Sequence, residues 1–100
     1  MKRLSKEKRK EIENLLVHGY RKKTNGYISL VIERKGNIKR IKRGRAYFQL
    51  VFGLELTPHE IIHHVDGNKE NDSPSNLEMI DTTNFDYHTS KHHAGKRKNG

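Results

Sequence analysis

The chain has 100 residues, of which 31% are hydrophobic and 33% are charged, so it is expected to bury one small core as a single domain. It contains no cysteine, which excludes disulfides and cysteine-ligated zinc sites but leaves histidine-based metal sites open. No apolar run approaches the roughly 18–20 residues of a membrane span, and the N-terminus lacks the apolar core of a signal peptide. We therefore expect a cytoplasmic protein.

The charge is divided unevenly along the chain. Residues 1–50 carry 16 Lys/Arg and 4 Asp/Glu, whereas residues 51–100 carry 5 Lys/Arg and 8 Asp/Glu. Five of the seven histidines lie in residues 60–93. A basic half joined to a half rich in His, Asp and Asn predicts two roles, polyanion binding in the first and chemistry in the second.

Residues 5–18 are predicted to form the first helix, because Ser5 is a good capping residue and Gly19 follows the last turn. Its charged side is interpreted either as a solvated surface or as a phosphate-binding one. Residues 20–26 are predicted to be a polar loop that contains an Asn-Gly turn signal.

Two strands are predicted next, at residues 27–33 and 38–43, joined by a turn. The resulting hairpin is strongly basic, so it can lie along a nucleic-acid groove, or its Lys and Arg can protect an exposed edge. We assign nucleic-acid contact to four basic residues of the second strand, which are Lys39, Arg40, Lys42 and Arg43.

Residues 44–53 are predicted to form a packing helix that ends at Gly53. The apolar face is expected to contain Ala46, Tyr47, Leu50 and Val51, with Phe48 and Phe52 beside it. Residues 54–59 are predicted to be a connector, since Pro58 interrupts regular structure.

Residues 60–65 predict a strand, and its alternation places His63 and His64 on opposite faces. A loop of turn-forming residues at 66–76 and a second strand at 77–80 follow. From about Thr83 we expect a helix that brings two histidines four residues apart onto one face, where they can chelate one ion; they are His88 and His92. The predicted unit is a ββα motif that a metal closes and stabilises.

At this point the residues resemble a known family. The motif is Glu60-x-x-His63-His64-x-Asp66-Gly67-Asn68, Asn71, Ser73-Pro74-x-Asn76-Leu77-Glu78 and His88-x-x-x-His92. This order and combination resembles the HNH endonucleases, and in particular their small phage and intron-type members. A weaker likeness extends upstream through Asn25-Gly26-Tyr27-Ile28, Arg45 and Gly53-x-x-Leu56-x-Pro58-x-Glu60, so that it spans roughly residues 25–93.

The resemblance implies a role for each matching position. His64 matches the general base that activates water, and His63 matches a position that binds metal directly. Asn76 matches a structural asparagine that ties the loop to the strand and keeps the base histidine oriented. The helix histidines are matched by His88 and His92, at least one of which is expected to bind metal. Arg45 matches an arginine that is expected to contact phosphate.

The spacing departs from the family at the helix. Members commonly have a histidine nine residues after the motif asparagine, where this chain has Phe85, so about three residues are inserted. The helix ligand is therefore His88, His92 or Asn84, and the sequence leaves the three open. Asp72 stands where many members have a second asparagine and is interpreted as a loop contact only.

We accordingly predict a small single α+β domain with an N-terminal basic helix and β-hairpin, a packing helix and a C-terminal ββα-metal motif. Residues 1–57 are the basic DNA-binding and packing part, 58–93 the catalytic core and 94–100 a basic tail. The expected function is metal-dependent hydrolysis of double-stranded DNA, by nicking or double-strand cutting, which leaves 5′-phosphate and 3′-hydroxyl ends.

Several points stay open at the level of the sequence. The ion is Mg²⁺, Mn²⁺, Ni²⁺ or Zn²⁺, and the protein is a monomer or a homodimer. A phage or mobile-element context follows from the resemblance alone, in a phage-infected or other bacterial cell. The rival interpretations are a non-catalytic, metal-stabilised nucleic-acid-binding module, a ribonuclease on the same scaffold, and a basic accessory protein for packaging.

Overall fold

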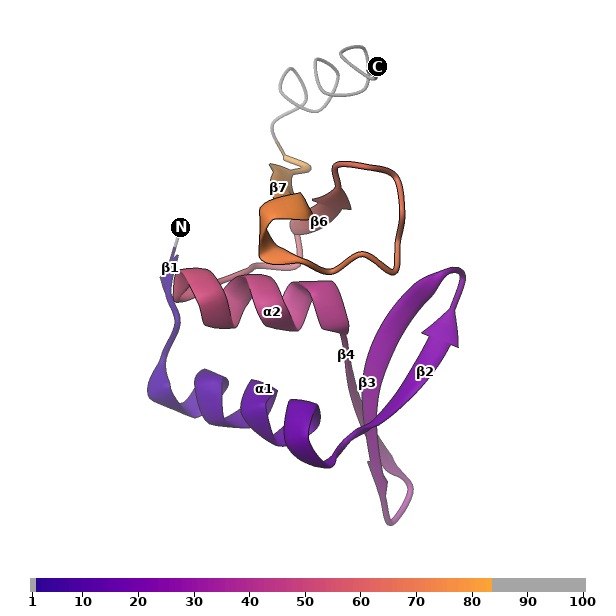
Figure 1. Ribbon diagram of the computed structural model, residues 1–100. Coiled ribbons are helices and arrows are strands. Elements are labelled where there is room, and N and C mark those ends of the chain that lie inside the picture. The colour runs from indigo at the N-terminus through magenta and orange to yellow at the C-terminus, as the bar shows by residue number, and fades with distance from the viewer. Residues whose placement is uncertain (1, 84–100) are drawn as a thin grey trace.

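The structure is a computed structural model that describes residues 2–83 (Figure 1). Two α-helices alternate with short antiparallel strands, which makes the fold α+β. The elements are β1 Lys2–Arg3, α1 Lys6–His18, β2 Tyr20–Thr24, β3 Tyr27–Arg34, β4 Asn37–Lys42, α2 Arg43–Phe52, β5 Leu54–Glu55, β6 Glu60–His64, the 3-10 helix η1 Pro74–Asn76 and β7 Leu77–Asp81. Neither α-helix in this part of the chain is long and apolar enough to cross a membrane.

Helix α1 forms as its sequence predicts. The Ser5 side chain accepts a hydrogen bond from the Lys8 amide at 3.1 Å and so satisfies one of the free donors of the first turn. Ile12 and Leu15 point inward and are almost fully buried. They pack with Leu30 of β3 and Ala46 of α2, so the apolar stripe of α1 is one wall of the first core.

The central sheet has three strands in the order β2-β3-β4, so the prediction of a polar loop at residues 20–26 is wrong. All five residues of β2 are exposed, and a strand that buries no side chain leaves no apolar alternation in the sequence. Its pairing depends instead on the turn. Asn25 and Gly26 both have positive φ, at 53° and 88°, which is the two-residue turn that suits the twist of a hairpin.

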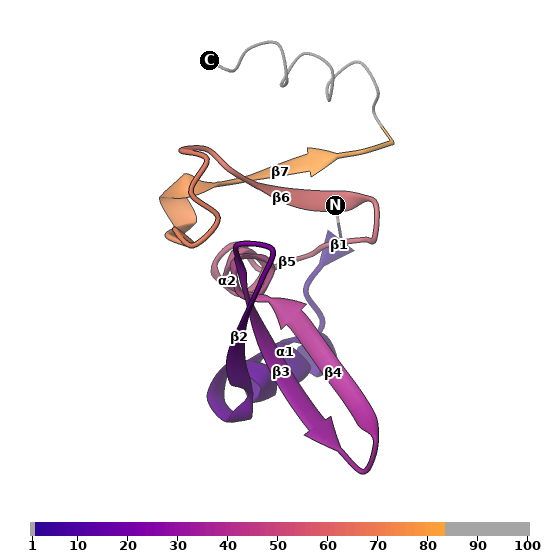
Figure 2. The ribbon, with the colours of Figure 1, turned by 90° about the vertical axis from the view of Figure 1, so that its right-hand side faces the viewer.

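Helix α2 is the middle layer of the molecule, between α1 with the three-stranded sheet on one side and the β6–β7 hairpin on the other (Figures 1 and 2). Ala46 faces the first core, and Phe48 faces a second core that contains Leu56 and Leu77. The helix is therefore buried on two sides rather than along the single face that was predicted.

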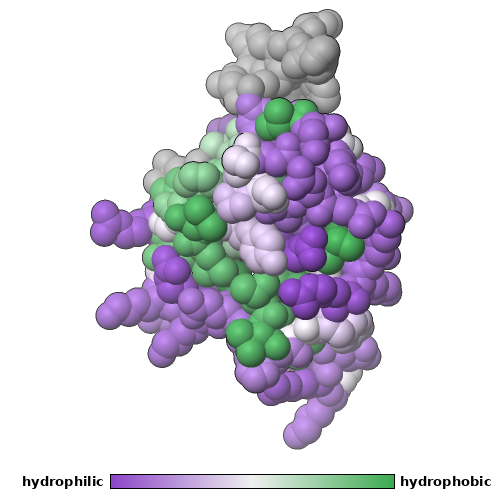
Figure 3. Space-filling view, viewed as in Figure 1, coloured by the Kyte–Doolittle hydropathy of each residue, from purple (hydrophilic) through white to green (hydrophobic). Residues whose placement is uncertain are grey.

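The C-terminal end of α2 departs further from the prediction. Val51, expected on the buried face, is 57% exposed, and Phe52 is 50% exposed. Figure 3 shows apolar surface gathered toward this end of α2, whereas hydrophilic surface covers the side of the β2–β3 hairpin and the loop after β6. The predicted connector also contains a short strand, because Leu54 and Glu55 of β5 pair with Arg3 and Lys2 of β1.

Between the two cores lies a fully buried polar side chain. The Gln49 Oε1 atom accepts a hydrogen bond from the Leu56 amide at 2.9 Å, and its Nε2 atom donates to the Arg45 carbonyl at 3.3 Å. A buried amide is tolerated when its hydrogen-bonding groups are satisfied. Gln49 therefore fixes the chain after α2 against the helix.

Candidate active site

Strand β6 carries the two adjacent histidines on opposite faces, as the alternation predicts. Only 6% of the His64 side chain is exposed, whereas 48% of the His63 side chain is exposed. Antiparallel pairing with β7 sets His64 opposite Leu77 and His63 opposite Glu78. The hairpin thus points His64 toward α2, and His63 to its other face.

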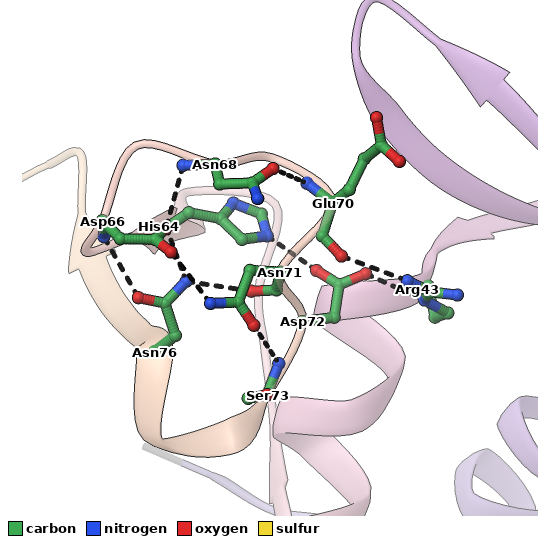
Figure 4. A network of polar contacts seen from close by, with 9 residues as sticks. All are labelled: Arg43, His64, Asp66, Asn68, Glu70, Asn71, Asp72, Ser73 and Asn76. Atoms are coloured by element: carbon green, nitrogen blue, oxygen red, sulfur yellow. Dashed lines mark hydrogen bonds and ion pairs between the residues drawn. The ribbon is translucent and has the colours of Figure 1, made fainter.

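His64 contacts a buried carboxylate from the loop that follows its own strand (Figure 4). The Nε2 atom lies 2.6 Å from Oδ1 of Asp72, whose side chain is 3% exposed. The other carboxylate oxygen, Oδ2, accepts a hydrogen bond from Arg43 Nε at 2.9 Å. Asp72 therefore joins the histidine to the first residue of α2, and the expectation that it makes only a loop contact is wrong.

Arg43 was expected to contact nucleic acid, but its guanidinium is engaged inside the protein. In addition to Asp72, it donates through Nη2 to the carbonyl of Glu70 at 3.2 Å. Only 21% of its side chain is exposed. The structure thus gives Arg43 the task of holding the loop after β6 against α2.

Arg45, which was expected to contact phosphate, has partners inside the protein. Its guanidinium donates to the carbonyls of Glu60 and Thr57, at the start of β6. Burial lowers the pKa of Arg45, and the Glu60 carboxylate opposes that change. The side chain therefore acts as a bracket between α2 and the strand that carries the histidines.

Asn76 closes the loop immediately after His64. The amides of Val65 and Asp66 donate to the backbone carbonyl and to Oδ1 of Asn76, at 2.9 and 3.0 Å. Its Nδ2 atom donates to Asp66 Oδ1 and to the carbonyl of Asn71, both at 2.9 Å. Asn76 thereby ties the loop to the end of β6 without touching the imidazole itself.

Asp66 is the second organising residue of this loop. Hydrogen bonds from the Asn71 side chain, the Asn68 backbone and the Asn76 side chain lower the pKa of its carboxyl group below the ordinary value of 3.8. Because the pKa is lowered on folding, the ionised carboxylate stabilises the loop fully at any pH above 3.8. This stabilisation is lost as the pH falls through the lowered pKa. The loop is therefore fully organised at neutral pH.

The predicted metal ligands are only partly within the described residues. His63 has the Glu78 carboxylate beside it, with Nδ1 to Oε1 at 3.3 Å, so a nitrogen donor and an oxygen donor meet on the outer face of the hairpin. Within residues 2–83 no three His, Asp or Glu side chains gather to form a metal site. His88, His92 and Asn84, and the helix predicted to carry them, lie outside these residues.

His64 and Asp72 line a cleft of about 1090 Å³ that runs along β4, α2 and β6. Six Lys/Arg and three Asp/Glu side chains line it, so it is net basic. Lys39 lies there with its Nζ atom 3.6 Å from a Glu11 carboxylate. Arg40 is exposed and has no ion-pair partner in the part of the chain that the structure describes.

Two lysines converge on an aromatic ring beside the histidine. The Lys42 and Lys69 ammonium groups lie 4.0 and 4.9 Å from the Tyr27 ring centroid, and that ring lies 5.9 Å from the His64 ring. Lys69 also donates to the Asn25 carbonyl at 3.2 Å, which attaches the hairpin tip to the loop. The ring face attracts both ammonium groups and so gathers two positive charges beside His64.

Sequence reasoning missed Asp72, Tyr27 and Lys69 as members of this site. One signal in the sequence indicated that acidic residues would pair with basic ones. Residues 51–100 carry more Asp/Glu than Lys/Arg, whereas residues 1–50 are strongly basic. Compared with protein-family models, with curated proteins and with solved structures, the chain has no match. The likeness to the HNH family therefore depends on the motif residues alone.

Proposed function

We propose that the protein is a metal-dependent endonuclease of the HNH type that hydrolyses phosphodiester bonds in double-stranded DNA. The observation that carries this proposal is a histidine, His64, fixed by a carboxylate at the wall of a net basic cleft. A neutral imidazole is a suitable acceptor for the proton of an attacking water near neutral pH. The basic cleft favours a phosphate backbone as the ligand.

The roles divide between the two faces of the β6–β7 hairpin. On the inner face His64 accepts a proton, while Asn76 and Asp66 hold the loop that follows it. On the outer face His63 is proposed to bind the metal together with His88 or His92. His63 and His64 both lie at the end of β6, so a phosphate at this end of the hairpin is the one that both would serve, and a bound ion would neutralise charge on it and on the departing 3′ oxygen.

Cleavage of supercoiled plasmid tests the proposal directly. Purified protein is incubated with Mg²⁺, Mn²⁺, Ni²⁺ or Zn²⁺, and with EDTA as the control. We expect nicked or linear plasmid with at least one ion and none with EDTA, with 5′-phosphate ends. Tight, salt-sensitive DNA binding without cleavage by any ion contradicts the proposal and supports the binding module, and cleavage of RNA alone supports the ribonuclease.

The lysines beside Tyr27 give a second expected result. Removing one lysine that binds a phosphate of duplex DNA should reduce the slope of log K against log salt concentration by about 0.9. We expect Lys42→Ala/Lys69→Ala to reduce the magnitude of that slope by almost 2, as measured by fluorescence anisotropy over a range of salt concentrations.

The matched control is Lys10→Ala/Lys22→Ala, which removes the same charge from exposed positions outside the cleft. Its salt slope should change much less than that of the cleft variant. Equal changes in the two double variants indicate a general effect of net charge and contradict a role of this cluster in DNA binding.

A further inference from the structure

The contact between His64 and Asp72 has a geometry that selects one form of the histidine. Each oxygen of the buried carboxylate has its own donor, Oδ1 facing His64 Nε2 at 2.6 Å and Oδ2 facing Arg43 Nε at 2.9 Å. An ionised carboxylate can only accept hydrogen bonds. The proton of a neutral His64 ring must therefore lie on Nε2.

We propose that Asp72, held in place by Arg43, is the positioning residue that fixes the tautomer and orientation of His64 and so makes Nδ1 the proton-accepting atom. This inference rests on the proposed nuclease function. Within residues 2–83, His64 Nδ1 has no hydrogen-bond partner, so its lone pair is not already engaged by a donor of the protein. The partner of the other ring nitrogen determines the tautomer of a histidine, and here that partner is a carboxylate.

Arg43 keeps the carboxylate from turning. Its second contact, to the Glu70 carbonyl at 3.2 Å, anchors the guanidinium to the same loop that carries Asp72. The hydrogen bond between the Arg43 guanidinium and the Asp72 carboxylate joins two charged groups, and such a bond is stronger than one between neutral groups. Arg43 is the first residue of α2, the helix at the centre of the fold. Through Asp72, it therefore fixes the orientation of His64 relative to that helix.

An asparagine at this position would not satisfy both neighbours. Its single acceptor, Oδ1, must face either Arg43 or His64, since both of them donate. If Oδ1 faces Arg43, the amide nitrogen points at His64 Nε2 and forces the proton onto Nδ1. If Oδ1 faces His64, two donors oppose each other at Arg43 in a buried site, which is costly.

The test is the tautomer of His64, read from ¹⁵N shifts of the imidazole nitrogens at alkaline pH, in parallel with the rate of plasmid cleavage. We expect the Nε2-protonated form in the wild type and the Nδ1-protonated form in Asp72→Asn. Because the base is then blocked, cleavage by Asp72→Asn should fall by about 10²–10⁴-fold.

Two further variants separate positioning from a merely structural role. Asp72→Asn/Arg43→Met removes the competing donor, so Oδ1 can face His64. We expect this double variant to regain the Nε2-protonated form and most of the wild-type cleavage rate. Arg43→Met alone retains the carboxylate and should keep the Nε2-protonated form, which leaves the proposal testable should Asp72→Asn fail to fold.

The outcomes distinguish this inference from the proposed function. An unchanged tautomer in Asp72→Asn, or an Nδ1-protonated ring in the wild type or in Arg43→Met, overturns the role of Asp72. Failure of the double variant to recover the tautomer overturns the competition between Arg43 and His64. The expected tautomers in a protein that cleaves no DNA with any ion support the positioning role while contradicting the nuclease.

Discussion

Replacement of His64 by alanine is expected to reduce metal-dependent DNA cleavage by about 10²–10⁴-fold, the usual contribution of a general base. The described residues hold the imidazole at the wall of the cleft against a buried carboxylate partner. Its removal leaves the lysines beside Tyr27 in place, so the affinity for DNA should not change. The measurement is the single-turnover rate under saturating protein, with anisotropy for binding.

Two other histidines provide controls for this variant. His59 lies just before β6, and its described hydrogen bonds are made by its backbone carbonyl, to the Thr82 amide and hydroxyl. His59→Ala should therefore keep the wild-type rate. His63→Ala should raise the concentration of metal needed for cleavage, because His63 is proposed as a ligand on the opposite face. Wild-type cleavage by His64→Ala contradicts its assignment as the base.

Much of the fold is predictable because the relevant signals are local. The cap at Ser5 and the alternation of β3 each depend on residues a few positions apart. Strand β2 carries no such signal, since none of its side chains is buried. The burial of α2 on two sides also could not be predicted from the sequence. A helix between two cores lacks the single apolar stripe that marks an amphipathic helix.

The site divides in the same way between local and tertiary information. Alternation within β6 is enough to separate His63 from His64, and the motif is enough to select Asn76. The contact of Arg43 with Asp72 spans 29 positions, so no periodicity reveals it. A basic residue in a sequence does not disclose whether its guanidinium has partners inside the protein, as those of Arg43 and Arg45 do.

Substitution of Gly44 by alanine is expected to disrupt the site more than the fold. A Cβ atom at this position would lie 2.6 Å from Asp72 Oδ1 and 3.4 Å from His64 Nε2, so the carboxylate must move. Alanine gains about 1 kcal/mol in helix propensity over glycine, whereas overpacking of a buried site costs about 1–3 kcal/mol. The net cost is then about 0–2 kcal/mol, so the melting temperature should fall by at most about 16 °C.

The activity of Gly44→Ala should fall much further, because the displaced carboxylate no longer holds Nε2 of His64. We expect a loss approaching that of His64→Ala, together with a mixture of the two imidazole tautomers in the ¹⁵N spectrum. Gly36→Ala is the matched control, since no atom lies within 4 Å of a Cβ there and its positive φ of 82° strains the backbone alone. It should lower the melting temperature while the cleavage rate and the tautomer stay unchanged. Full activity in Gly44→Ala would mean that the cleft tolerates a displaced Asp72, and that the base needs no fixed partner.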